Sequence, residues 1–249
     1  PYNKYGIYFL NISYTKMILK EIKYAIRPFF IVLVTLLITY FGNQYYAEMM
    51  NVTGIDYSYI LINVNKSIPF ISWTIYPYII SYPFWMLTFF VIAYYDEKRF
   101  YLIYETLVST LIICGIWYFL FQSDVEFWRT TSGLFIDNNY LIPISNPNFT
   151  EKIVLLIYSA AGPRNALPSM HVLISWISII AVRKNPKVPL IWKIIIITLS
   201  VCIIVSTQTL KQHYIIDLIV AVFLGDTIYR LYHQYPRLRL IKKFKFSNH

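Results

Sequence analysis

Long apolar stretches alternate with short polar segments along most of the 249-residue chain. A bilayer core about 30 Å thick requires roughly 20 mostly apolar residues in each spanning helix. Six stretches qualify, and they cover residues 24–42, 71–95, 100–121, 167–182, 188–207 and 212–232. Because a lipid-exposed backbone must satisfy its hydrogen bonds internally, this pattern predicts an all-α integral membrane protein with a bundle of six transmembrane helices.

The same pattern predicts how the helices are connected. Pro77 and Pro83 lie inside the second stretch, which favours a kinked helix. Residues 183–187 leave room for a tight hairpin between the fourth and fifth stretches. No repeat or change of composition divides the chain. We therefore expect one membrane domain over residues 1–249, with its core at about residues 24–232 and basic cytoplasmic tails at both ends.

Composition agrees with a membrane protein and excludes an ordinary water-soluble enzyme. Hydrophobic residues make up 57% of the chain and charged residues 14%, whereas soluble domains carry about 25% charged residues. The net charge of +10 could indicate nucleic-acid binding, but in a chain this apolar it points first to a membrane. Cys114 and Cys202 lie in apolar stretches, so neither a disulfide framework nor a cysteine-based zinc site is expected.

The position of the basic residues predicts the orientation. Of the 22 Lys and Arg residues, 17 lie in the terminal segments or beside residues 96–99 and 183–187, which six spans place on one side. The five on the opposite side are Lys66, Arg129, Lys152, Arg164 and Lys211. The positive-inside rule puts both termini in the cytoplasm and the loop 122–166 outside. A composition rich in Ile, Asn, Lys and Tyr favours a bacterial plasma membrane. Glu105, near the inner end of the third stretch, is expected to pair with Lys98 or Arg99.

Two histidine motifs fall on the external side. Residues 168–171 (Pro-Ser-Met-His) open the fourth stretch, and His213 and Asp217 lie at the start of the sixth. Residues four apart on a helix share a face, so the Asp217 carboxylate can accept the imidazole N–H and leave the other nitrogen free as a nucleophile or base. His171 could then protonate a leaving oxygen.

Nearby groups complete the requirements for phosphoryl transfer without a metal or cofactor. A phosphate could be held by Ser169, Lys211, Arg164 and Arg129. More ordinary roles are also open, since His213–Asp217 could be a structural hydrogen bond or part of a metal site. Ser169 could simply cap a helix, and Lys211 or Arg129 could extend to the interface. No third or fourth metal ligand of fitting type is evident, and the two motifs on one face favour chemistry.

The motifs resemble those of the type 2 phosphatidic acid phosphatase (PAP2) superfamily of integral membrane phosphatases. Its second motif, Pro-Ser-x-His, matches residues 168–171. Its third, Ser-Arg-x5-His-x3-Asp, is matched in register by Ser206, His213 and Asp217, although Thr207 stands where Arg is usual.

Further residues are similar to one subgroup, which contains the fungal inositol phosphorylceramide synthases and bacterial relatives. They are the Ser-Thr…Lys-Gln-His-Tyr…Asp form of the third motif, Asn-Ala-Leu-Pro-Ser at 165–169 and Ile-Pro-Phe-Ile at 68–71. This resemblance implies that His213 is the nucleophile, Asp217 its orienting partner and His171 the general acid. It also implies that Ser169 binds phosphate oxygens and that Lys211 takes over from the missing arginine.

The first motif of the family, Lys-x6-Arg-Pro, has a misleading match. Lys20, Arg27 and Pro28 fit it letter for letter, but they precede the first span on the predicted cytoplasmic side. In the family this motif follows the third span, so its counterpart should fall within residues 122–166. Arg129 and Arg164 are both open as its arginine.

Together these observations predict a membrane lipid phosphatase acting at the extracytoplasmic face. Its substrate would be a lipid phosphomonoester or diphosphate, cleaved through a phosphohistidine. One alternative is transfer of a phospho-headgroup, as in the inositol phosphorylceramide synthases, with the same machinery. An alternative of another class is a non-catalytic membrane binder or transporter. Apart from the lipid substrate and the membrane, we expect no nucleic-acid partner.

Overall fold

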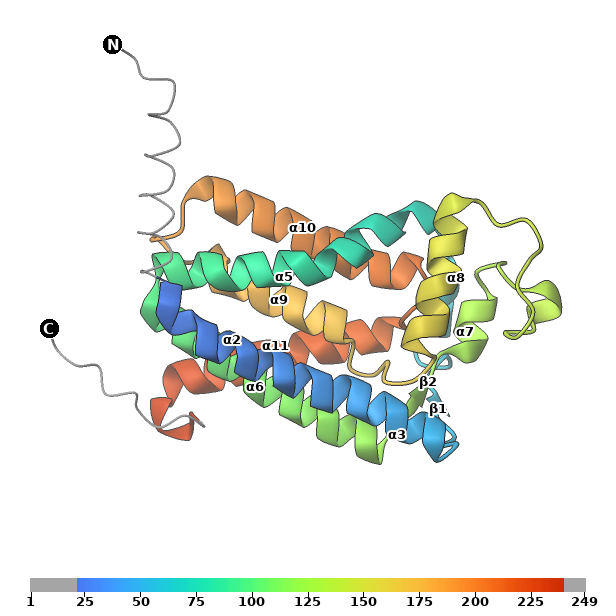
Figure 1. Ribbon diagram of the computed structural model, residues 1–249, viewed down its shortest axis with the longest axis horizontal. Coiled ribbons are helices and arrows are strands. Elements are labelled where there is room, and N and C mark those ends of the chain that lie inside the picture. Colours follow the sequence, from blue (N-terminus) through green and yellow to red (C-terminus); the bar gives the residue numbers. More distant parts are fainter. Residues whose placement is uncertain (1–21, 240–249) are drawn as a thin grey trace, which may run out of the picture.

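The computed structural model describes residues 22–239, and helices dominate this range (Figure 1). Six long helical segments run roughly parallel to one axis. They are η1 (Lys23–Ala25), α2 (Ile26–Leu36), η2 (Leu37–Gly42) and α3 (Asn43–Met49) in succession, then α5 (Ile75–Tyr95), α6 (Glu97–Leu120), α9 (Met170–Arg183), α10 (Leu190–Thr209) and α11 (Ile215–Gln234). The first segment therefore extends seven residues beyond the predicted end at residue 42.

Shorter elements cover one end of this bundle. They are β1 (Ile55–Asp56), α4 (Ile62–Ser67), η3 (Ser72–Thr74), β2 (Ser123–Asp124), α7 (Glu126–Thr130), η4 (Ile136–Asn138) and α8 (Phe149–Ala161), while η5 (Pro236–Leu238) follows α11. β1 and β2 pair in parallel over two residues. α8 lies across this end of the bundle, whereas α2 begins and α11 ends at the opposite end (Figure 1).

Four of the described helical segments are long and apolar enough to cross a membrane, namely Lys23–Met49, Ser72–Tyr95, Glu97–Leu120 and Leu190–Thr209. α9 has 14 residues, or about 21 Å of helix. α11 has 20 residues but carries Asp217, Asp226 and Arg230. The structure thus confirms a nearly all-α fold with helices suited to a membrane, whereas the count of six spans stays a prediction.

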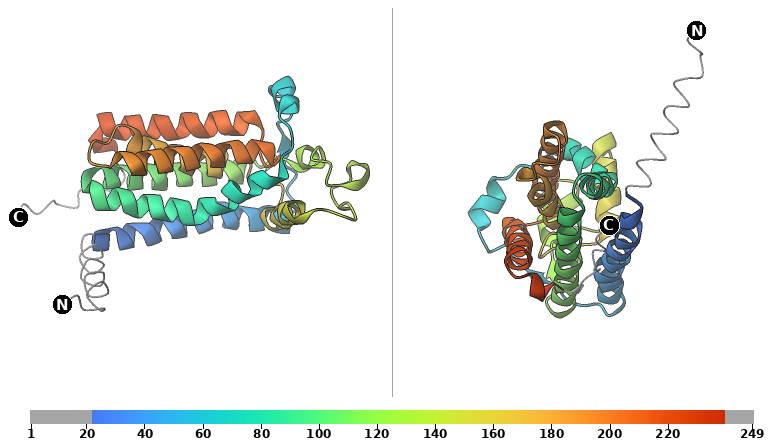
Figure 2. Two further views of the ribbon diagram at one scale, coloured as in Figure 1. Left: turned by 90° about the horizontal axis from the view of Figure 1, so that it is seen from above. Right: turned by 90° about the vertical axis from the view of Figure 1, so that its left-hand side faces the viewer.

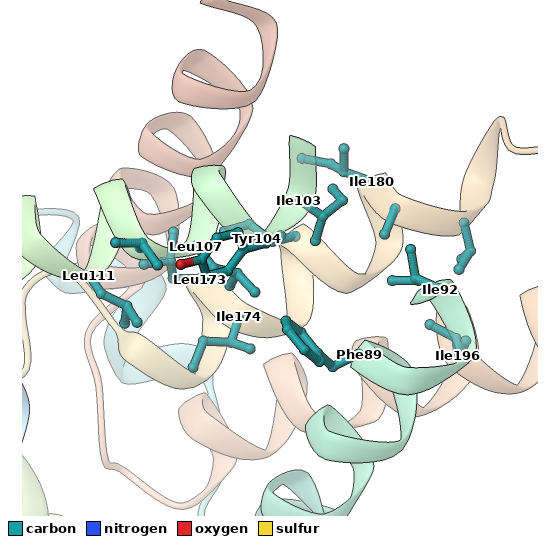
Figure 3. Packing of buried hydrophobic residues seen from close by; sticks show 14 of the residues in the cluster. Phe89, Ile92, Ile103, Tyr104, Leu107, Leu111, Leu173, Ile174, Ile180 and Ile196 are labelled. Atoms are coloured by element: carbon teal, nitrogen blue, oxygen red, sulfur yellow. The ribbon is translucent and has the colours of Figure 1, made fainter. Parts of the chain in front are cut away.

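α9 is the central helix of the bundle. Twelve of its 14 residues are buried, and it contacts α5, α6, α10 and α11. A helix that is apolar all round suits this position. Figure 3 shows Leu173, Ile174 and Ile180 of α9 among the labelled apolar side chains of α5 and α6. Along the bundle axis, α9 starts deeper than the ends of α5 and α10 (Figure 1), so its first turn is recessed from the bundle end.

The outer helices expose apolar side chains instead of burying them. α2 lies at the edge of the bundle in both views of Figure 2. Phe30 and Ile38 are 55% and 66% exposed, and Ile191 of α10 is 60% exposed. Apolar surface of this extent is unfavourable in water and suits contact with lipid. Pro83 lies inside α5, which bends along its course (Figure 1), as its sequence predicts.

One sequence interpretation changes at the end of the bundle opposite α8. Glu105 pairs with Arg239, whose Nη2 lies 2.8 Å from Oε1 of Glu105, and not with Lys98 or Arg99. Arg99 is engaged elsewhere, because it donates to the carbonyls of Ile180 and Ala181 at the end of α9.

The misleading match to the first motif lies at this same end of the bundle. Arg27 and Pro28 lie in α2 at this end, across the bundle from the start of α11 (Figure 1). Lys20 and most of the basic tails lie outside the described residues.

Candidate active site

His213 lies in the connection between α10 and α11, two residues before α11 begins. Its Nδ1 is 3.0 Å from the carbonyl oxygen of Ala166 and 3.2 Å from Oδ2 of Asp217. A carbonyl oxygen can only accept a hydrogen bond, so Nδ1 carries the proton. In a neutral ring Nε2 then keeps its lone pair, which is the form required of a nucleophile or base.

Asp217 connects the two histidine motifs. It is fully buried in the first turn of α11, and its Oδ2 also accepts a hydrogen bond from the backbone N–H of Tyr214 at 2.9 Å. Its backbone carbonyl accepts from the N–H of Ser169 at 3.2 Å. Ser169 is the N-cap residue of α9, with its Oγ 3.4 Å from the backbone nitrogen of Val172. One aspartate therefore orients His213 and holds the start of α9 beside it.

His171 occupies the first turn of α9 inside an aromatic surround. Its ring stacks on Tyr78, with centroids 4.1 Å apart and planes 17° apart. Trp85 and Tyr82 follow at centroid distances of 5.0 and 5.6 Å. Nε2 of His171 is buried and has no hydrogen-bond partner among residues 22–239. Ser169, two residues before His171, bonds the Asp217 that orients His213, so the structure brings both histidine motifs to one region.

Arg129 reaches from α7 to the connection between α10 and α11, residues 210–214, here called the histidine loop. It is 2% exposed, and its Nη2 donates to Oε1 of Gln212 at 2.6 Å. Its Nη1 donates to the hydroxyl of Tyr140 at 2.7 Å and to the carbonyl of Tyr158 at 3.0 Å. A buried guanidinium next to the residue that precedes His213 is well placed to attract a phosphate.

Lys211 belongs to the same loop, whereas Arg164 is directed elsewhere. Lys211 Nζ donates to the carbonyl of Ile68 and lies 4.0 Å from the ring centroid of Trp128. Burial lowers the pKa of Lys211 to about 8. Arg164 instead forms a partly exposed ion pair with Asp124 of β2. Arg129 thus bonds the loop to which Lys211 belongs, whereas Arg164 is paired with Asp124.

A comparison with known families bears on this arrangement. A family model described as the PAP2 superfamily matches residues 47–231, about three quarters of the chain, including both histidine motifs. The chain belongs to the PAP2 superfamily. Membership indicates phosphatase-type chemistry on lipids and confirms the broader resemblance, while the inositol phosphorylceramide synthase subgroup stays a prediction. No curated protein and no solved structure matches the chain.

Within this PAP2 fold, several positioning residues have no signal in the sequence. Oγ of Ser123 accepts from the backbone N–H groups of Ala166 and Leu167, at 2.6 and 3.1 Å. Oε1 of Gln122 accepts from the N–H of Asn165 at 2.8 Å. These bonds fix the segment whose carbonyl orients His213. Because the partners are more than 40 residues apart, no motif spacing indicates them.

Other contacts hold the start of α11 in this PAP2 protein. Asn65, fully buried in α4, accepts from the N–H of Ile215 at 2.9 Å through its Oδ1. This caps a backbone donor that the first turn of a helix leaves without a partner. The hydroxyl of Tyr214 donates to Oδ1 of Asp56 at 2.8 Å. β1 and α4 therefore fix the backbone that carries His213 and Asp217.

Proposed function

We propose that this PAP2 protein hydrolyses a lipid phosphomonoester or diphosphate through a phosphohistidine formed on His213. The observation that carries the proposal is the pair of acceptors at His213 Nδ1, which reserve Nε2 for attack on phosphorus. Superfamily membership supports phosphatase-type chemistry.

The proposed reaction has two steps. In the first, His213 Nε2 forms a bond to phosphorus as the bond from phosphorus to the lipid oxygen breaks, and protonated His171 gives its proton to that oxygen. In the second, His171 takes a proton from water while the water oxygen binds phosphorus and the N–P bond breaks. Inorganic phosphate and the lipid product leave. Arg129, Lys211 and Ser169 stabilise the charge on the phosphoryl oxygens.

We place the site at the extracytoplasmic surface of a bacterial plasma membrane. The basic residues support this orientation, because Arg99, Arg183 and Lys187 lie at the end of the bundle opposite the histidine loop. A site at the bundle end would let a lipid present its headgroup there while its tails remain beside the exposed apolar side chains of the outer helices. Polyprenyl diphosphates and phosphatidic acid-type lipids are the substrate classes we propose.

Purified protein with labelled lipid phosphates in detergent tests the proposal. We expect free phosphate without a new phospholipid, loss of turnover in His213→Asn, and unchanged turnover in chelator. His233→Asn is the matched control, since His233 lies at the far end of α11 and should leave activity intact. A labelled new phospholipid would instead support headgroup transfer. Turnover that persists in His213→Asn, or no turnover at all, would refute the proposed mechanism.

A further inference from the structure

Gln212 directly precedes His213 and is 3% exposed. Its Oε1 accepts the 2.6 Å hydrogen bond from Nη2 of Arg129. A guanidinium has donors and no acceptor, so the oxygen of the Gln212 amide, and not its nitrogen, must face Arg129. The orientation of the amide is therefore fixed by chemistry, and its NH2 group points away from Arg129.

Two nitrogen donors in this pair have no hydrogen-bond partner within residues 22–239. Nε2 of Gln212 and Nε of Arg129 are both buried and make no hydrogen bond to any residue in the described range. A buried donor that is left unsatisfied is destabilising, so buried polar groups in this state require an explanation. Both groups are N–H donors, which complement the oxygens of an anion, and they belong to the residue that precedes His213 and to the arginine bonded to it.

We propose that Gln212 binds the phosphoryl group that His213 receives. This inference rests on the proposed function and extends it to a residue outside the family motifs. Nε2 donates to a non-bridging phosphoryl oxygen, and Oε1 holds Arg129 so that its Nε serves the same group. A fixed donor aimed at developing charge stabilises the transition state without reorganisation.

The variant Gln212→Glu separates the two roles of the amide. It keeps an oxygen that can accept from Arg129 but replaces the NH2 donor with a second oxygen. We expect inhibition by orthovanadate, a mimic of phosphorus in the transition state, to weaken by about 100-fold, and kcat/KM to fall by a similar factor. Gln234→Glu adds the same charge to an exposed site at the far end of α11, and should keep wild-type inhibition.

The outcomes distinguish this inference from the function on which it rests. If wild-type protein releases phosphate and is inhibited by vanadate, but folded Gln212→Glu is inhibited equally well, Gln212 only positions Arg129 and the inference fails alone. If wild-type protein neither releases phosphate nor responds to vanadate, the proposed function fails as well. Gln212→Met, which has a side chain of similar length and no charge, covers the case in which Gln212→Glu does not fold. Its expected loss is the same, and vanadate inhibition at the wild-type level in the folded variant would overturn the inference.

Discussion

The tautomer of His213 is controlled by two acceptors of different kinds, a backbone carbonyl and a carboxylate. The Ala166 carbonyl cannot be removed by substitution of its own side chain, and Ser123 holds its segment in place. Asp217 adds charge to this arrangement and stabilises the imidazolium-like ring that forms when Nε2 binds phosphorus. Loss of either acceptor should therefore have a different consequence from loss of the ring itself.

Asp217→Asn tests whether the charge of the carboxylate contributes beyond the hydrogen bond to the Ala166 carbonyl. The amide cannot offer the negative charge, so we expect kcat to fall by at least about 100-fold while KM for a lipid phosphate changes little. Some turnover should remain, because the Ala166 carbonyl still accepts the Nδ1 proton. Steady-state kinetics on protein with unchanged folding measure the effect. Full activity in this variant would argue against a catalytic role for Asp217.

The two arginines offered by the sequence should respond differently to substitution. Arg129→Lys removes the fork that bonds Gln212, Tyr140 and Tyr158, and we expect kcat/KM to fall by about tenfold or more. Arg164→Lys alters a partly exposed ion pair with Asp124, so its kcat/KM should stay within about twofold of wild type. Activity assays on both proteins decide the choice, and the reverse ranking would assign the phosphate to Arg164.

Lys211 predicts a pH dependence of anion binding. Burial lowers its pKa to about 8, so the ammonium is charged below that pH and loses its proton as the pH rises through it. Inhibition by inorganic phosphate should therefore weaken between about pH 7 and pH 9. In Lys211→Arg this part of the pH profile should disappear, because a guanidinium stays charged. Phosphate itself titrates in the same way with both proteins, so the variant also serves as the control for that titration. Identical profiles for the two proteins would exclude Lys211 from the site.

At the level of whole elements, a close approach between the first helical segment and α6 supports the site. A Cβ at Gly115 of α6 would lie 2.7 Å from Cβ and Cγ2 of Thr39 in η2. The same region also holds the segment that orients His213, since the Tyr40 carbonyl accepts from Nδ2 of Asn165, next to Ala166, at 2.8 Å. π-helical turns such as η2 are frequent at functional sites.

Gly115→Ala should consequently destabilise the protein by about 1–3 kcal/mol, because the two helices must separate to admit a methyl group. The matched control is Gly42→Ala, since a Cβ there meets nothing within 4 Å and the helical backbone accepts alanine. Thermal unfolding in detergent measures both. Equal melting temperatures for Gly115→Ala and wild type would show that the helices do not pack as described.

Much of the helical framework could be predicted from hydropathy, but the ends of the helices depend on local chemistry. The stretch predicted from residue 167 begins as a helix at Met170, because Ser169 adopts an extended backbone and caps it. The first helix continues through Asn43 and Gln44 to Met49. These polar residues end the apolar pattern but not the hydrogen-bonded turns.

For the molecule as a whole, sequence spacing could predict partners close in the chain but not partners brought together by folding. His213 and Asp217 are four residues apart, which indicates their contact, although His213 precedes α11 and only Asp217 lies on that helix. The contacts of Gln212 with Arg129 and of Asn65 with Ile215 join residues 83 and 150 positions apart. Glu105 and Arg239 are separated by 134 positions. Such pairs are set by tertiary packing, so periodicity and motif reading leave them undetermined.

The predicted orientation is a property of the whole molecule and can be tested in cells. With Cys114 and Cys202 replaced by alanine, single cysteines at exposed Lys66 and Lys98 report on the two ends of the bundle. A membrane-impermeant maleimide should label the Lys66→Cys protein in intact cells and the Lys98→Cys protein after lysis, because basic segments remain in the cytoplasm. The opposite labelling would place the histidine loop inside.

The most direct test of the central claim is isolation of the phosphorylated enzyme. Purified protein is mixed with a lipid phosphate carrying radiolabelled phosphorus and quenched rapidly in alkali, in which phosphohistidine is stable. The account predicts a labelled protein whose label is lost in acid and maps to His213, and no labelled protein from His213→Asn. Rapid turnover by wild-type protein without any label on His213, together with turnover by His213→Asn, would contradict it.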